Sequence, residues 1–287
     1  MPLSLTPRVQ ATYLKELVDQ TEMLLADARR RKLETVDARW QLSSYSDETL
    51  IDNLFSVNTM NSEEFVYLVW KDTQEEVVLQ TEGVLVEAHH PPVISTGMDY
   101  AGKLNDLVQS IVVVSAPSDD AFSKAVQGIE AIYSFMAQFN TKVNTIGNFK
   151  VGNLSAIQGE TRLLTPLARV HTDVVDIEHI DTGNVLRNML TRGTHQYTED
   201  NVISYLKWEP TAEGKMVVSD MNPALLKPGH IVDVGLSFRL IKVPNRVVFQ
   251  SRLDSCTVME CGGVEALKTI MKQHQNDEDT LPRPPKK

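Results

Sequence analysis

The sequence predicts an α+β protein with an antiparallel β-sheet or sandwich, a long N-terminal helix, a central helix and a C-terminal helix. Three observations carry this prediction. Apolar residues recur at helical spacing near both ends and in the middle of the chain, and short Val-rich runs fill much of the remainder. Residues 231–259 alternate between apolar and polar side chains, which is typical of a long antiparallel hairpin.

Composition narrows the class of protein. Hydrophobic residues make up 42% of the 287 positions, charged residues make up 23%, and the formal net charge is -10. An acidic chain repels polyanions unless basic residues cluster locally, so nucleic acid is not the expected partner. No apolar run approaches the roughly 18 residues that cross a membrane, and the N-terminus lacks the regions of a signal peptide. We therefore expect an intracellular protein, cytoplasmic or nuclear, without a membrane partner.

The patterns divide the chain into three parts. An N-terminal helical segment covers residues 1–60, and an α+β body covers residues 61–275. A charged, proline-rich tail, which we expect to be disordered, covers residues 276–287.

The first segment predicts an amphipathic helix at residues 6–36, where Thr6 can cap the first turn and Pro7 suits the first helical position. Four basic residues fall near the helix end, where cations interact favourably with the helix dipole: Arg29, Arg30, Arg31 and Lys32. Their simplest interpretation is a solvated helix end. The alternative is a contact to nucleic acid or phosphate, for which one short basic cluster is a weak signal.

Short strands are expected next, at residues 63–72, 75–83 and 84–90, separated by polar turns. His89 and His90 end the last of them, and two prolines follow. Because prolines end a central strand, we expect both histidines on a loop or at a sheet rim. Adjacent side chains in a strand point to opposite faces, so this pair does not suit a single metal ion.

A buried strand at residues 111–115 leads into the central helix, which Ser118 can cap and which carries Asp119 and Asp120 in its first turn. The loop between them has no glycine and contains two acids. Such a loop would repel phosphate, so it does not suit a nucleotide. A second, short helix is expected at residues 184–191.

The long hairpin is the strongest pattern in the chain. We expect its first arm, residues 231–243, to be one straight ribbon that turns near Pro244. One face of this arm would be buried, and the other would carry polar residues such as Asp233 and Arg239. A closing helix is expected at residues 264–275.

His171, Asp173 and His230 form a candidate iron site. A His-x-Asp pair on a strand, followed by a distant histidine, resembles the double-stranded β-helix dioxygenases, which hold Fe(II) with two histidines and one carboxylate. In that alternative, Arg239 would anchor the cosubstrate 2-oxoglutarate. The geometry opposes it, because His230 and Arg239 on one straight strand would lie about 30 Å apart and face opposite sides. The iron site alone would survive if another residue held the cosubstrate.

The same stretch offers a second metal hypothesis. Asp173, Asp176, His179 and Asp181 could hold a hard divalent cation, because oxygen ligands suit such ions. Their spacing matches no calcium-binding loop, and the simplest interpretation is a solvated turn.

The last third of the chain resembles an uncharacterised family of proteins from mushroom-forming fungi. That family carries a phrase like YHTEDNxVxYY, then a GDIVEAQVSF strand and a closing LRSVxLL strand. The matching residues here are Tyr197, Thr198, Glu199, Asp200, Asn201, Tyr205, Gly229, Ile231, Val232, Ser237, Phe238, Arg252, Leu253 and Ser255. The resemblance implies no fold and no activity. The family phrase has Asp where this chain has His230, which argues against His230 as a metal ligand of the family.

Together these observations predict a non-enzymatic binding or self-assembly protein, whose ligand the sequence does not identify. The helix at residues 6–36 and the long hairpin are the surfaces on which we expect a homo-oligomer to form. A dioxygenase dependent on Fe(II) and 2-oxoglutarate is the first alternative. The second is a nucleic-acid-associated protein that binds through basic side chains, namely Arg29, Arg30, Arg31, Lys32, Arg246 and Arg252.

Overall fold

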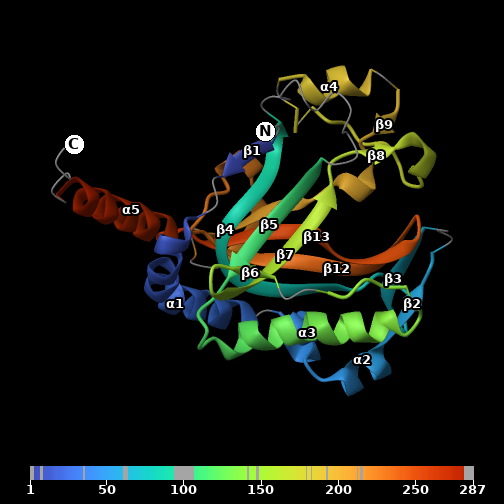
Figure 1. Cartoon of the computed structure of the whole chain (residues 1–287), viewed down its shortest axis with the longest axis horizontal. Coiled ribbons are helices and arrows are strands. Elements are labelled where there is room, and N and C mark those ends of the chain that lie inside the picture. Colours follow the sequence, from blue (N-terminus) through green and yellow to red (C-terminus); the bar gives the residue numbers. More distant parts are fainter. Residues whose placement is uncertain are drawn as a thin grey trace, which may run out of the picture.

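The protein is a mixed α+β structure built on one large, mostly antiparallel sheet (Figure 1). This confirms the predicted fold class at that level. The computed structural model describes residues 3–6, 9–34, 36–60, 64–93, 107–140, 142–146, 149–178, 180–181, 183–191, 193–211, 213 and 216–280. None of the helices in these residues combines the length and hydrophobicity that a membrane crossing requires.

The helices of the described residues are α1 at Ala11–Leu33, α2 at Glu48–Leu54, α3 at Asp120–Ala137, α4 at Val185–Leu190 and α5 at Gly262–Thr280. The large sheet contains β1 at Leu3–Thr6, β2 at Phe55–Asn58, β3 at Phe65–Trp70, β4 at Val78–Val93, β5 at Val108–Val114, β6 at Lys150–Val151, β7 at Leu154–Arg162, β10 at Ser204–Pro210, β11 at Met216–Asp220, β12 at Ile231–Val243 and β13 at Arg246–Glu260. A small second sheet joins β8 at Thr165–Pro166 to β9 at His195–Gln196.

The main path of the large sheet runs β11-β10-β13-β12-β4-β5-β7-β6. β4 pairs with β12 along its first half and with β5 along its second half, so the sheet turns there. The turn brings β7 back against β13, where the Thr161 hydroxyl donates to the carbonyl of Leu253 at 2.6 Å. Gly159 permits this approach, since a Cβ there would lie 2.5 Å from a methyl group of Leu236.

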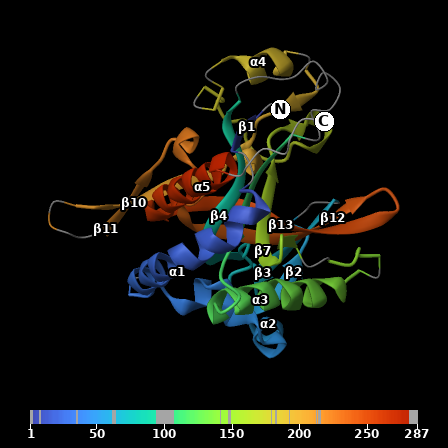
Figure 2. The ribbon, with the colours of Figure 1, turned by 60° about the vertical axis from the view of Figure 1, so that its left-hand side comes forward.

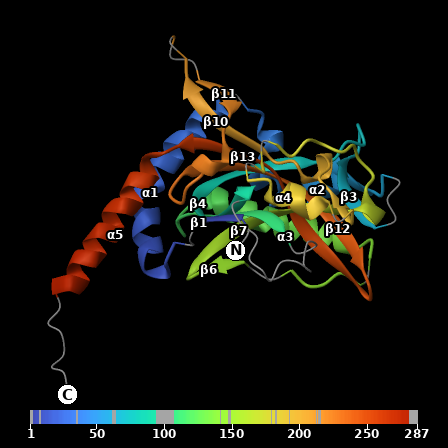
Figure 3. The ribbon, with the colours of Figure 1, turned by 90° about the horizontal axis from the view of Figure 1, so that it is seen from above.

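Two apolar layers lie on opposite faces of this bent sheet. The main core fills the inside of the bend, where α3 packs against β12 and β13 through residues such as Ile132, Phe238 and Leu253. On the other face, α1 and α5 lie side by side (Figure 3) and bury residues such as Leu17 and Ile270. The far half of α5 extends beyond the body (Figure 1).

The N-terminal expectation was wrong in its details. Thr6 lies in β1, which pairs with β4, and α1 begins at Ala11 after Gln10 rather than after a capping Thr6. Pro7 lies outside the described residues. The central helix is capped by Asp119, whose carboxylate accepts the backbone N–H of Phe122, and not by Ser118.

His89 and His90 lie within a strand, not on a loop. The predicted break between residues 83 and 84 does not occur, because Gly83 continues the ladder to β12 and β4 runs on to Val93. Prolines are tolerated near the end of β4 because β1 pairs with His90 and then with Val93, skipping Pro91 and Pro92 in an irregularity of the register.

The long hairpin forms as one ribbon, and β12 runs without a reverse turn from Ile231 to Val243. We expected one face of the hairpin to be exposed to solvent. Instead its polar face is also buried, as the low exposure of Asp233, Ser237 and Arg239 shows. The end of the chain also differs from the prediction, since α5 continues to Thr280 and includes the first residues of the expected tail. Residues 281–287 lie outside the described residues.

A buried ion cluster covers one end of that polar side. It corrects the view of the α1 end as solvated for Arg29 and Lys32, whereas the Arg30 side chain is exposed. The Lys32 ammonium is only 1% exposed and lies 2.5 Å from Glu82 and 2.8 Å from Asp233. Arg29 forms further ion pairs at 3.0 Å with Glu82 and with Asp119. The cluster therefore ties α1 to β4, to β12 and to the start of α3.

Burial raises the pKa of both carboxylates that pair with Lys32, but the nearby cations offset it to different extents. Burial opposes ionisation of Glu82, but Lys32 and Arg29 together outweigh it and lower the pKa of Glu82. Burial raises the pKa of Asp233 to about 6, and Lys32 opposes that rise only in part. Asp233 is thus the member of the cluster whose ionisation works against folding.

The variant Asp233→Asn tests this cluster through pH. The folded pKa of Asp233, about 6, lies above the ordinary 3.8, so between these values the folded protein binds more protons than the unfolded chain. From this group alone, the free energy of unfolding should fall as the pH rises through that window, by at most about 1.4 kcal/mol per pH unit. Histidines with a lowered folded pKa, such as His230, give both proteins the opposite slope. Urea unfolding from about pH 5 to about pH 7, where Glu82 stays ionised, should therefore show the wild type losing stability relative to Asp233→Asn as the pH rises. Equal slopes in both proteins would refute the assignment.

Candidate functional site

The structure does not assemble the predicted iron site. His171 and Asp173 lie exposed in an irregular loop rather than on a strand, because a 3-10 turn at Leu167–Arg169 ends the preceding extended segment. His230 is buried directly ahead of β12. Within the described part of the chain, no three His, Cys, Asp or Glu residues are grouped as a metal site.

The ring of His230 is also unsuited to bind a metal. Its Nδ1 accepts the backbone N–H of Lys227 at 3.2 Å, so a neutral ring carries its proton on Nε2. Burial, and after it the charge of Lys227, lowers the pKa of His230 to about 4, which keeps the ring neutral. With one nitrogen engaged and the other protonated, this histidine has no free lone pair for iron.

The acids of the second metal hypothesis mostly serve the backbone. The Asp181 carboxylate accepts two N–H groups at the start of α4, at 2.9 and 2.8 Å. Asp176 accepts the N–H of Glu178 at 3.0 Å, and Asp173 is exposed. His179 lies outside the described residues. Asp176 and Asp181 therefore fit the interpretation as a turn better than they fit a cation site.

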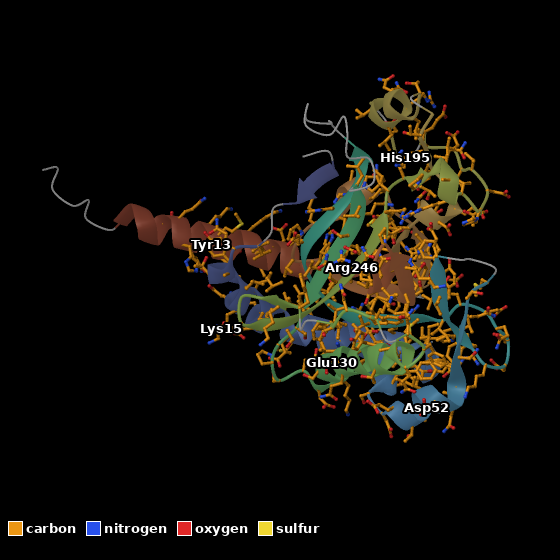
Figure 4. The ribbon with its side chains drawn as sticks, turned by 45° about the vertical axis from the view of Figure 1, so that its right-hand side comes forward. Tyr13, Lys15, Asp52, Glu130, His195 and Arg246 are labelled. Carbon is orange, nitrogen blue, oxygen red and sulfur yellow. The ribbon has the colours of Figure 1, made fainter. Side chains whose placement is uncertain are left out.

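The basic residues of the nucleic-acid hypothesis do not share one surface. Two of the four at the α1 end belong to the buried ion cluster, while Arg30 and Arg31 pair with acids nearby. Arg246 is exposed at the hairpin turn, where Figure 4 labels it. Arg252 is buried in β13.

A different group of arginines gathers at the other end of the polar side of the sheet. Arg239 and Arg252 come from neighbouring strands of the hairpin, and Arg162 ends β7. Arg169 comes from the 3-10 turn that follows β8. In the hairpin ladder, Arg239 lies opposite Gln250. Because side chains alternate along a strand, Gln250 and Arg252 lie on the same face of β13, so Arg239 and Arg252 share that face.

Two of these arginines have carboxylate partners. Arg252 lies 2.7 Å from Asp254 and 3.8 Å from Glu76, and it donates to the backbone carbonyl of Asp200 at 3.2 Å. Arg169 lies 3.1 Å from Glu64. Their charges are therefore neutralised within the fold.

The other two arginines lack such partners. Arg239 is only 5% exposed, donates from Nε to Gln250 at 2.8 Å and lies 4.9 Å above the ring of Phe65. Within the described residues, neither Arg239 nor Arg162 has a carboxylate at ion-pair distance. Burial first, and then neighbouring arginines, lowers the pKa of Arg239 to about 10 and also lowers that of Arg162.

Arg162 and Arg169 line a cavity of about 410 Å³ together with Leu164 and Pro166. We call it the basic cavity. His195 pairs with Pro166 in the small sheet at the rim of this region (Figure 4). Burial, followed by the charge of Arg162, lowers the pKa of His195. The lining thus holds two guanidinium groups, of which Arg169 is paired with Glu64, while Arg162 is attracted by Glu64 and Asp200 without an ion pair among the described residues. Arg162 is therefore the group suited to a carboxylate or phosphate.

Residues that carry the fungal resemblance meet beside this site. Arg252 contacts Asp200 as described above, and Ser237 pairs with Arg252 across the ladder. Thr198 and Asn201 cap the intervening 3-10 turn reciprocally. A scan against protein-family models matches no family and a search of curated proteins finds no relative, so the resemblance stays a prediction.

Sequence reasoning named Arg239 only as a cosubstrate anchor and missed Arg162 and Arg169. One signal was present, since Arg162 ends the strand run LSAIQGETR. An arginine at a strand end is common, however, and nothing in the sequence relates it to an arginine on the distant hairpin. The bend at β4 creates that relation.

The variant Arg162→Gln should raise the pKa of His195, because it removes a positive charge that opposes protonation of the ring. The titration of His195 can be followed by NMR with the ring carbons labelled. Arg246→Gln, which changes an exposed arginine at the hairpin turn, is the matched control and should leave His195 unchanged. An unchanged His195 titration in Arg162→Gln would show that this guanidinium does not act on the rim of the cavity.

Proposed function

We propose that this chain is a binding protein for a small anionic ligand, whose carboxylate or phosphate group occupies the basic cavity. The observation that carries the proposal is the pair Arg162 and Arg239, which are half-buried and buried without carboxylates at ion-pair distance within the described residues. A buried charge without a counter-ion is costly, and two neighbouring guanidinium groups repel each other. A bound anion would relieve both effects.

The geometry also limits the role of each arginine. Arg162 and Arg169 line the cavity and would contact the ligand, in a planar geometry that suits a carboxylate or phosphate. Arg239 does not line it and would act through the field it adds behind Arg162. The proposal assigns binding and no reaction to these groups.

Titration calorimetry with inorganic phosphate and with 2-oxoglutarate tests the proposal. We expect saturable binding of at least one of them, weakened about tenfold or more in Arg162→Gln, since a hydrogen bond to a charged group contributes roughly 1.5–3 kcal/mol. Arg246→Gln should bind as the wild type does. No saturable binding of either anion, or equal loss in both variants, would refute it. Adding Fe(II) separates this proposal from the dioxygenase alternative, which requires the metal to strengthen 2-oxoglutarate binding through His171 and Asp173.

Self-assembly is a second candidate function, and the outer edge of β11, which pairs with no other strand of the described residues, favours it. The strand β11 is an edge strand on a projecting hairpin with β10 (Figure 2). Val217 and Val218 there are 40% and 55% exposed. An exposed apolar edge can pair with a second copy of itself, antiparallel about a twofold axis.

Backbone direction identifies the residue that would form such a contact. Met221 donates its N–H to Tyr205 of β10 at 2.9 Å, so alternate residues Ser219 and Val217 also direct their backbone groups toward β10. Val218 therefore directs its N–H toward the outer edge.

Val218→Pro should remove that outward donor and abolish dimers while leaving the β10–β11 ladder intact. Val218→Thr keeps both the donor and the branched side chain, and serves as the control. Size-exclusion chromatography with light scattering, over a range of protein concentrations, measures the outcome. A wild type that stays monomeric at high concentration, or a dimer that Val218→Pro does not affect, excludes this edge as the interface.

A further inference from the structure

A second pocket lies directly beside the basic cavity along β7. It has a volume of about 230 Å³ and opens between α3, β7 and β13. Two aromatic rings, Phe149 and Phe249, and two carboxylates, Glu130 and Glu160, contribute to its lining. We call it the acidic pocket; Glu130 comes from α3, where Figure 4 labels it.

The two carboxylates have no cation partner. Glu160 accepts a hydrogen bond from the Gln250 amide at 3.3 Å. In the part of the chain that the structure describes, neither Glu130 nor Glu160 forms an ion pair with Lys, Arg or His. A pocket lined by both carboxylates and aromatic rings is a combination that suits organic cations.

The acidic pocket and the basic cavity are held in a fixed relation. Glu160 and Arg162 are two residues apart on β7, so their side chains leave the same side of the strand about 7 Å apart. Gln250 connects Glu160 to Arg239, which lies behind Arg162, because it accepts from Arg239 at 2.8 Å and donates to Glu160 at 3.3 Å. Arg162 and Glu160 therefore lie next to each other on β7, but among the described residues they form no ion pair with each other.

We propose that the ligand is a zwitterion, with an acid group in the basic cavity and an ammonium or other organic cation in the acidic pocket. This inference rests on the proposed function and adds the second charge and the spacing to it. A flexible molecule of this class, with its opposite charges separated by about the 7 Å between residues 160 and 162 along the strand, can reach both halves of the site at once. A simple anion fills only one half.

Aliphatic ω-amino acids provide the probes. Hexanoate carries the acid alone, whereas 6-aminohexanoate adds an ammonium group at nearly the required spacing and 4-aminobutyrate holds it too close. In calorimetric titrations of the full chain, we expect 6-aminohexanoate to bind about tenfold more tightly than hexanoate, because one charged hydrogen bond is gained. The gain should be smaller for 4-aminobutyrate than for 6-aminohexanoate.

Variants assign the gain to the acidic pocket. Glu160→Gln, and independently Glu130→Gln on α3, should bring 6-aminohexanoate down to the affinity of hexanoate and leave hexanoate binding no weaker than in the wild type. Asp52→Asn, an exposed acid on α2 that Figure 4 labels, is the matched control and should preserve the gain. Two independent variants keep the test decisive if one of them folds poorly.

The outcomes separate the two proposals. If the wild type binds hexanoate but 6-aminohexanoate no more tightly, or if neither glutamate variant reduces the gain, the zwitterion inference is overturned and the anion-binding function stands. If the wild type binds none of the phosphate, 2-oxoglutarate, hexanoate or 6-aminohexanoate probes, both are overturned. A gain that Glu130→Gln and Glu160→Gln both abolish, with hexanoate binding intact, supports the inference.

Discussion

The contact of Lys32 with Glu82 and Asp233 is the constraint on which the rest of the structure depends. It places the charged end of α1 against the polar side of β12 and β4. Removing one member of such a buried group typically costs about 3–5 kcal/mol, because the remaining charges stay buried without a partner. The cluster thereby makes the polar side of the sheet an interior surface with its own electrostatics.

The candidate site follows from that arrangement and from the bend in β4. The bend brings the end of β7 next to β13, and so places Arg162 near Arg239 although the two residues are distant in sequence. Acids neutralise the Lys32 end of the polar side, whereas at the other end the guanidinium groups of Arg162 and Arg239 remain without carboxylates at ion-pair distance in the described residues. That asymmetry is the physical basis for an anion site at one end of the sheet.

The sequence was sufficient for the α+β class and for β12 as one uninterrupted ribbon, since both depend on local periodicity. It failed where tertiary contacts override local signals. The prolines after His90 indicated a strand end, but pairing with β1 carries β4 past them. Arg29 and Lys32 look like a solvated helix end, and only the fold supplies their buried acids. Arg162 could not be related to Arg239, because the relation depends on the bend.

The most direct test of the account is an NMR titration that observes the arginine Nε–H groups while phosphate is added at constant ionic strength. The account predicts a saturable shift of the Arg162 signal, whereas the signal of Arg252, whose guanidinium is already paired with Asp254, should move little. Small shifts of equal size at all exposed arginines, without saturation, would contradict it.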